Sequence, residues 1–160
     1  MLKWEGRKKD REEKNVLPDK EALIVFPYWP KGIFHPDYPF WKEIGKIYPD
    51  FLYVVPQDVH IPEEFQGEHR IVILPGKSTL GFIIQIKEVL PELNRVIVVG
   101  ADIHIQRIIR DIERIFPNAK YRPVLVSSSS PITFVWREKV LLSLPKFLYV
   151  PLSLIKEYYL

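Results

Sequence analysis

Three side chains with acid, base and anion-binding chemistry follow one apolar run of the sequence. Residues 95–99 have the composition of a buried strand, Gly100 allows a tight turn after it, and Asp102, His104 and Arg107 come next. A helical pattern begins at residue 103, so these side chains fall at the sheet edge where parallel α/β folds bind ligands. We expect Asp102 to cap the helix. Arg107 can clamp a phosphate, sulfonate or carboxylate, and a cationic His104 can add a donor or move a proton.

A second anion-binding pattern is formed by Gly76, Lys77, Ser78 and Thr79, which follow another apolar run. It resembles the end of a phosphate-binding P-loop, but the earlier glycine of that motif is replaced by Ile71. A Walker-type nucleotide hydrolase is therefore not predicted. A glycine turn and a serine-capped helix remain, and the N–H groups and dipole of such a helix start attract anions. The alternative interpretation is a helix cap and nothing more.

Other reactive residue types give weaker patterns. The four histidines are His35, His60, His69 and His104. They lack the spacing of a metalloprotease helix or of a two-histidine, one-carboxylate site, so no metal is predicted. The serine run 127–130 can present hydroxyls to a ligand or form a simple loop, and it lacks the Gly-x-Ser-x-Gly turn of serine hydrolases. The aromatic loop 28–41 can stack a ring or pack on the sheet.

Composition restricts the class of protein. The chain has 160 residues, of which 47% are hydrophobic and 27% charged, so it can bury one core. The net charge of +3 is a weak signal for nucleic acid, and the absence of cysteine excludes disulfides and thiolate sites. Residues 1–20 are too charged for a signal peptide or a membrane span, which favours a cytoplasmic protein. Abundant Ile, Lys and Glu and fifteen prolines are typical of a thermophilic source.

Apolar runs of strand length alternate with helical patterns from residue 22 onward. Strands are predicted at 22–26, 51–55, 70–74, 95–99 and 121–126, and helices at 40–48, 78–90 and 103–116, with a loop at 56–67. Residues 132–160 are predicted to be mostly helical, with breaks at Pro145 and Pro151. We expect a three-layer, Rossmann-like α/β sandwich of about five mainly parallel strands with helices on both faces. Residues 1–20 would be a charged tail or short helix, and 21–160 a single domain.

A family resemblance is carried by Lys77-Ser78-Thr79 opening a helix, then a Val-rich strand, His-x-x-Arg at His104 and Arg107, and the tail 156–159. This order is similar to the YdcF/SanA/ElyC-like proteins, a domain-of-unknown-function family often described as envelope-associated. The resemblance covers roughly residues 71–160. It implies a Rossmann-like fold and a nucleotide-like or polyanionic ligand, with His104 and Arg107 as the best carried-over positions. The chain departs from the family in lacking its glycine-rich turn after strand one, and we expect no membrane anchor of the kind common in the family.

Two functions follow from these patterns. The first is a small-molecule-binding domain, with no reaction specified, that holds a phosphate-bearing or nucleotide-like ligand. Its candidate site residues are Gly76, Lys77, Ser78, Thr79, Gly100, Asp102, His104 and Arg107. The second is a non-catalytic interaction module or homodimer that uses the aromatic loop 28–41 and the apolar tail 140–160, because the tail holds more apolar residues than one small helix needs.

Overall fold

The computed structural model describes residues 2–3, 16–26, 40–126 and 132–159. Its strands form one all-parallel sheet in the order β1-β4-β3-β2-β5-β6. The strands are β1 (Leu2–Lys3), β2 (Glu21–Val25), β3 (Leu52–Pro56), β4 (Ile71–Leu74), β5 (Arg95–Ala101) and β6 (Lys120–Val126). The five predicted strands are confirmed, and the two-residue β1 adds an edge strand that the sequence analysis did not predict.

The helices are α1 (Phe40–Ile47), α2 (Glu63–Glu68), α3 (Thr79–Val89), α4 (Ile105–Ile115), α5 (Ile132–Ser143) and α6 (Lys146–Tyr159). The short α2 lies where a loop was predicted, and it buries Phe65 against the sheet. The predicted break at Pro145 is confirmed, but the break at Pro151 is wrong because α6 continues through it. Pro151 is exposed, so water can satisfy the carbonyl oxygen that a proline leaves without an N–H partner.

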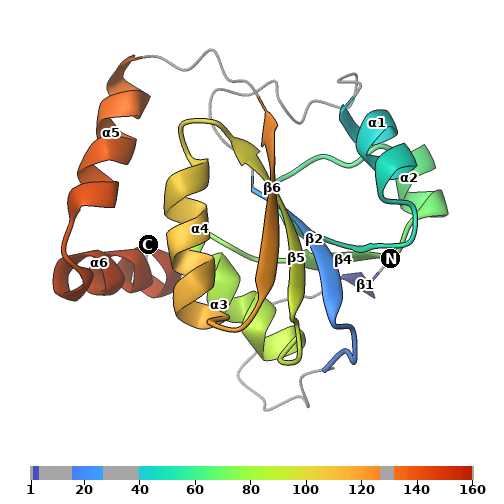
Figure 1. The fold of residues 1–160 in the computed structure, drawn as a ribbon, viewed down its shortest axis with the longest axis horizontal. Helices are drawn as coiled ribbons and strands as arrows, with labels where there is room; N and C mark the ends of the chain where they lie inside the picture. Colours follow the sequence, from blue (N-terminus) through green and yellow to red (C-terminus); the bar gives the residue numbers. More distant parts are fainter. Residues whose placement is uncertain (1, 4–15, 27–39, 127–131, 160) are drawn as a thin grey trace.

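Helices cover both faces of the sheet, which confirms the three-layer α/β, Rossmann-like fold (Figure 1). The alternation of β2 shows how the strands serve both layers. Ala22, Ile24 and Phe26 pack with α3 and α4, whereas Leu23 and Val25 pack with α1 and α2. The predicted apolar face of α4 is confirmed: its isoleucines are buried or partly buried in the first of these cores.

The C-terminal helices α5 and α6 lie outside the α3–α4 layer and contact it rather than the sheet (Figure 1). Helix α6 packs on α3, and α5 packs on α4. No helix in the described ranges is long and apolar enough to cross a membrane.

The chain reverses direction across the sheet between β2 and β5. Strands β3 and β4 extend the sheet on one side of β2, and α3 then carries the chain back to β5 on the other side. Ligands of open α/β sheets bind outside the carboxyl ends of the strands at such a switch point. Phe26, directly after β2, and the start of α4, after β5, therefore border the expected crevice.

The start of α4 differs from the prediction. Strand β5 continues through Gly100 to Ala101, a turn covers residues 102–104, and α4 begins at Ile105. The N-cap residue is His104 and not Asp102, whose Oδ1 accepts a hydrogen bond from the N–H of Ile103. The need for glycine at position 100 is also different. A Cβ atom there would lie 2.8 Å from Cδ1 of Ile108, so Gly100 allows α4 to pack closely on β5.

Candidate functional site

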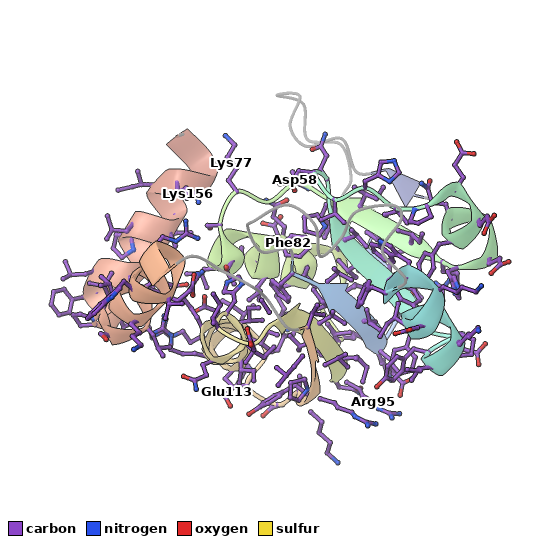
Figure 2. The ribbon with its side chains drawn as sticks, turned by 90° about the horizontal axis from the view of Figure 1, so that it is seen from above. Asp58, Lys77, Phe82, Arg95, Glu113 and Lys156 are labelled. Carbon is purple, nitrogen blue, oxygen red and sulfur yellow. The ribbon has the colours of Figure 1, made fainter. Side chains whose placement is uncertain are left out.

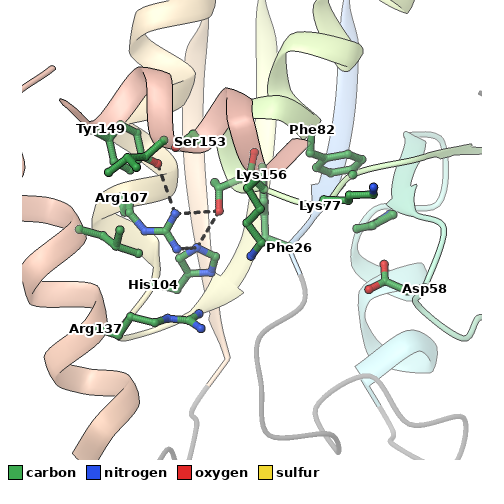
Figure 3. Close-up of a pocket in the computed structure, with 16 residues that line it drawn as sticks. Phe26, Asp58, Lys77, Phe82, His104, Arg107, Arg137, Tyr149, Ser153 and Lys156 are labelled. Atoms are coloured by element: carbon green, nitrogen blue, oxygen red, sulfur yellow. Dashed lines mark hydrogen bonds between the residues drawn. The ribbon is translucent and has the colours of Figure 1, made fainter. Parts of the chain in front are cut away.

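A cavity of about 460 Å³ lies at the carboxyl edge of the sheet, beside the switch point (Figure 3). The turn before α3, the first residues of α4 and one side of the α5–α6 pair surround it. The lining residues are Phe26, Pro56, Asp58, Gly76, Lys77, Ser78, Thr79, Phe82, His104, Arg107, Arg137, Leu141, Tyr149, Leu152, Ser153 and Lys156. We call this cavity the edge pocket.

The start of α3 contributes a capped helix end to the edge pocket. Ser78 is the N-cap, and its hydroxyl accepts a hydrogen bond of 3.0 Å from the N–H of Gly81. Gly76 lets the turn pass close to the helix, because a Cβ atom there would lie 2.9 Å from Cβ of Phe82. The Lys77 side chain is exposed. The first N–H groups of a helix have no carbonyl partner within it, so this end of α3 is suited to an anion.

Arg107 is held by the protein through all of its donors. Nε and Nη2 donate to the two carboxylate oxygens of Glu138 at 2.7 and 2.8 Å. Nη1 donates to Thr79 Oγ1 at 3.0 Å and to the Tyr149 hydroxyl at 3.3 Å, and Nη2 also contacts His104 Nε2 at 2.8 Å (Figure 3). A guanidinium has five N–H groups, and these five bonds use them. Glu138 therefore occupies the fork that a bidentate clamp on a ligand would use, and a ligand contact of Arg107 stays a prediction.

His104 is a neutral hydrogen-bond acceptor in this arrangement. A guanidinium can only donate, so the Nε2 atom that receives the Arg107 bond carries no proton, and the ring proton is on Nδ1. The Thr79 hydroxyl lies 3.1 Å from the same Nε2 atom and donates to it. Burial, reinforced by the charges of Arg107 and Arg137, holds the pKa of His104 well below its usual range. Without a bound anion His104 is therefore neutral, and a cationic His104 in contact with an anionic ligand stays a prediction.

A second polar contact joins α6 to α4. The Tyr149 hydroxyl donates to Asp111 Oδ2, and the Asp111 side chain is 0% exposed. Burial raises the pKa of Asp111, while Tyr149 and the nearby arginines lower it by a smaller amount. Arg110 stacks over the Tyr149 ring at 4.4 Å and donates to the carbonyl of Leu142 at 2.6 Å, near the end of α5. The polar groups of α4 thus fasten both C-terminal helices to the domain.

Glu138, Asp111 and Tyr149 complete this buried polar network and were not predicted from the sequence. One signal was present in the sequence: Arg107 and Asp111 are four residues apart and lie on one face of the α4 pattern. A charged pair at that spacing also occurs on solvent-exposed helix faces. Only the structure, in which α5 and α6 pack against the α3–α4 layer, shows that Arg107 and Asp111 are buried. Within the network, burial lowers the pKa of Arg107, but its hydrogen bonds and ion pair with Glu138 raise it by more.

The structure brings together six of the eight predicted site residues. Gly76, Lys77, Ser78 and Thr79 line the edge pocket with His104 and Arg107. Gly100 and Asp102 are not among the described residues that line it. The serine run 127–130 and residues 28–39 of the aromatic loop lie outside the described residues, while Phe40 and Trp41 belong to α1 and are buried.

The edge pocket has an excess of positive charge. Its charged lining side chains are Lys77, Arg107, Arg137 and Lys156 against Asp58. Glu138 balances Arg107, which leaves the two lysines and Arg137 as the cations that can face a ligand. Arg137 Nη2 lies 3.8 Å from Glu138, with its own side chain 51% exposed, so it can turn toward the pocket. Lys77, Lys156 and Asp58 lie along one edge of the molecule in Figure 2.

The arrangement also permits proton transfer. The Thr79 hydroxyl accepts a bond from Arg107 and donates to the unprotonated Nε2 of His104. A hydroxyl beside a neutral imidazole is the pairing that activates nucleophiles in other folds. The low pKa of His104 makes it a weak base, so the geometry supports positioning of Thr79 more strongly than catalysis.

Comparison with known proteins found no matching family model, no similar curated protein and no similar solved structure. The resemblance to the YdcF/SanA/ElyC-like proteins therefore stays a prediction, and the functional argument depends on the pocket itself.

Proposed function

We propose that the edge pocket binds a small phosphate-bearing or nucleotide-like molecule. The observation that carries the proposal is the excess of basic side chains around a capped helix start, at the switch point of a parallel sheet. The cavity volume lies within the range of about 300–1,000 Å³ typical of small-molecule sites.

The proposed orientation places the anionic group near the start of α3. Lys77 and Lys156 both line the pocket (Figure 3), and their ammonium groups can contact a phosphate there. Phe26, Phe82 and Pro56 form an apolar part of the lining, which suits the ring of a nucleotide-like ligand. Arg107 has an indirect role. Its hydrogen bonds hold Thr79 and His104 beside the ligand, and in this orientation Arg107 itself donates no hydrogen bond to the ligand.

Isothermal titration calorimetry with pyrophosphate and with ADP tests the proposal. We expect both probes to bind the wild type, and Lys77→Gln and Lys156→Gln each to weaken binding by roughly tenfold, the effect of one lost charge-assisted bond. Lys46→Gln, which removes an exposed lysine of α1 on the other side of the sheet, should bind as the wild type does. Absence of heat with both probes, or equal affinities in all four proteins, would reject the pocket as a phosphate site.

A second candidate function, contact with a macromolecular partner through the tail, is favoured by a different observation. Six large apolar side chains of α5 and α6 are exposed: Trp136, Val140, Phe147, Leu148, Leu152 and Ile155. A monomeric soluble domain rarely exposes such a cluster without a use for it. A homodimer formed through this surface would show twice the monomer mass in light scattering. The Phe147→Glu substitution would place a charge in the contact and dissociate the dimer into monomers.

A further inference from the structure

The solvent-facing side of α6 is mainly apolar, whereas an ordinary surface helix is polar on that side. From Lys146 to Lys156, the exposed positions are Lys146, Phe147, Leu148, Pro151, Leu152, Ile155 and Lys156. At 100° per residue, the five apolar positions among them form one continuous band along the helix. Phe147 is 74% exposed. The inward side carries the buried Tyr149, so α6 has apolar surface both toward the domain and toward solvent.

Helix α5 also exposes an aromatic and an aliphatic side chain. Trp136 is 62% exposed, and Val140, one turn later, is exposed as well. The Lys139 ammonium lies 5.6 Å from the Trp136 ring centroid. We call the exposed apolar residues of α5 and α6, together with Pro151, the tail face. Helices α5 and α6 stand on one side of the molecule, away from α1 and α2 (Figure 1).

Among residues 135–156 of these two helices, for which burial is described, every exposed charged side chain is basic. These are Arg137, Lys139, Lys146 and Lys156, and the acid between the first two, Glu138, is buried in its pair with Arg107. An occupant of the tail face must therefore cover apolar side chains and balance several positive charges at the same time. Apolar and aromatic residues bordered by lysine and arginine are the combination that places helices in the plane of an anionic bilayer.

We propose that the tail face docks on the surface of an anionic lipid bilayer, with α6 lying in the interface. This inference names an occupant for the exposed apolar surface on which the second candidate function rests, and its test needs no ligand in the edge pocket. Phe147, Leu148 and Ile155 would enter the boundary between headgroups and acyl chains, while Lys139 and Lys146, which lie outside the pocket lining, contact lipid phosphates. A second copy of this chain fits less well, because a two-fold contact through the same face would bring its lysines together.

Vesicle flotation of the full chain tests the proposal. The probes are phosphatidylcholine vesicles and the same vesicles with phosphatidylglycerol added, each at low and high salt. We expect binding to the anionic vesicles, weakening as salt screens the lysines. The double variant Phe147→Glu/Ile155→Glu should reduce the bound fraction at least about tenfold, because it places carboxylates in the apolar layer. Both residues are exposed and outside the pocket lining, so folding and the pocket should be unaffected.

Two further variants separate the possible outcomes. Ile47→Glu makes the same change at a 65% exposed position on α1 and should bind vesicles as the wild type does. Lys139→Glu/Lys146→Glu should remove the preference for phosphatidylglycerol. The proposal is overturned if the wild type floats with neither vesicle, or if Phe147→Glu/Ile155→Glu floats as well as the wild type. A dimer in light scattering that dissociates in that variant, without vesicle binding, would assign the tail face to a second copy.

Discussion

The starts of α3 and α4 look alike in the sequence and differ in the structure. Each follows a parallel strand at the same sheet edge, and each carries polar residues suited to an anion. At α3, Ser78 caps the helix and the exposed Lys77 stands over the pocket. At α4, His104 and Arg107 are buried and bonded to Thr79, Glu138 and Tyr149. The first helix start is open to a ligand, whereas the second forms the frame behind it.

Burial explains this division of roles. A charged side chain taken out of water must be paired and hydrogen-bonded, so Arg107 uses its donors on the protein before any ligand arrives. An exposed lysine keeps its hydration and can exchange it for a phosphate. A basic residue therefore indicates an anion-binding site only when its burial and its protein partners are known.

The largest expected effect comes from breaking the frame at α4. Glu138→Ala leaves Arg107 buried without its carboxylate, and we expect a loss of about 3–5 kcal/mol in the free energy of unfolding, measured in urea. The exposed pair of Arg95 and Glu21 is the matched control, because its atoms lie at a similar distance of 3.0 Å. Glu21→Ala should change the free energy by less than about 1 kcal/mol.

The Arg107→Met/Glu138→Leu double variant sharpens this test. It removes both charges and replaces them with apolar side chains, so it should be more stable than Glu138→Ala alone. If Glu138→Ala and Glu21→Ala had equal effects, the α4 start would not be the rigid frame described here.

A smaller effect is expected from the protonation of His104. Its pKa in the folded protein is lowered by burial, so below the unfolded value of about 6.5 the unfolded chain binds the extra proton and stability falls as pH falls. The slope can reach about 1.4 kcal/mol per pH unit. In His104→Gln, an amide oxygen can accept the bonds from Arg107 and Thr79 without titrating. Thermal unfolding from about pH 7 to pH 5 should show the extra slope only in the wild type.

Asp111 provides the internal check on that measurement. Burial raises its pKa, so its contribution to stability increases as pH falls, opposite to that of His104. Since Asp111 is present in both proteins, the difference between wild type and His104→Gln reports His104. Parallel pH profiles for the two proteins would contradict a neutral, buried imidazole.

The smallest expected effect compares the two helix caps directly. Ser78→Ala removes the acceptor of the Gly81 N–H bond and should cost about 1 kcal/mol in chemical denaturation. Asp102→Ala should cost clearly less, because α4 begins three residues later and its N-cap is His104. A larger loss for Asp102→Ala would restore it as the functional cap of α4.

Most of the fold could be predicted from the sequence because the strands are apolar on both sides. Residues 22–26, 51–55 and 96–99 show continuous apolar runs of strand length, which are typical of a strand covered on both faces. The boundary at Gly100 could not be predicted this way. The glycine suggested a turn, whereas the decisive fact is the close contact with Ile108 from the following helix. Likewise, Pro151 suggested a break that the exposed position of the proline makes unnecessary.

The pocket could be predicted in position but not in its internal organisation. Its position was predicted from two helices that each begin directly after a parallel strand. Six of the predicted residues line the pocket. The partners of His104 and Arg107 come from α5 and α6, which are distant in sequence and carry no motif. Residue type alone could not show that Glu138 neutralises the charge of Arg107, so it could not show which basic residues a ligand would contact.

Nuclear magnetic resonance of the backbone amides tests the difference between the two helix starts most directly. In a titration of the ¹⁵N-labelled protein with pyrophosphate, we predict the largest shifts at the amides of Lys77, Ser78, Thr79 and Leu80, and small shifts at Ile105 and Gln106. Lys77→Gln should require a higher pyrophosphate concentration for the same change. Largest shifts at Ile105 and Gln106, or no shifts at either helix start, would contradict the assignment of the α3 start as the ligand-facing one.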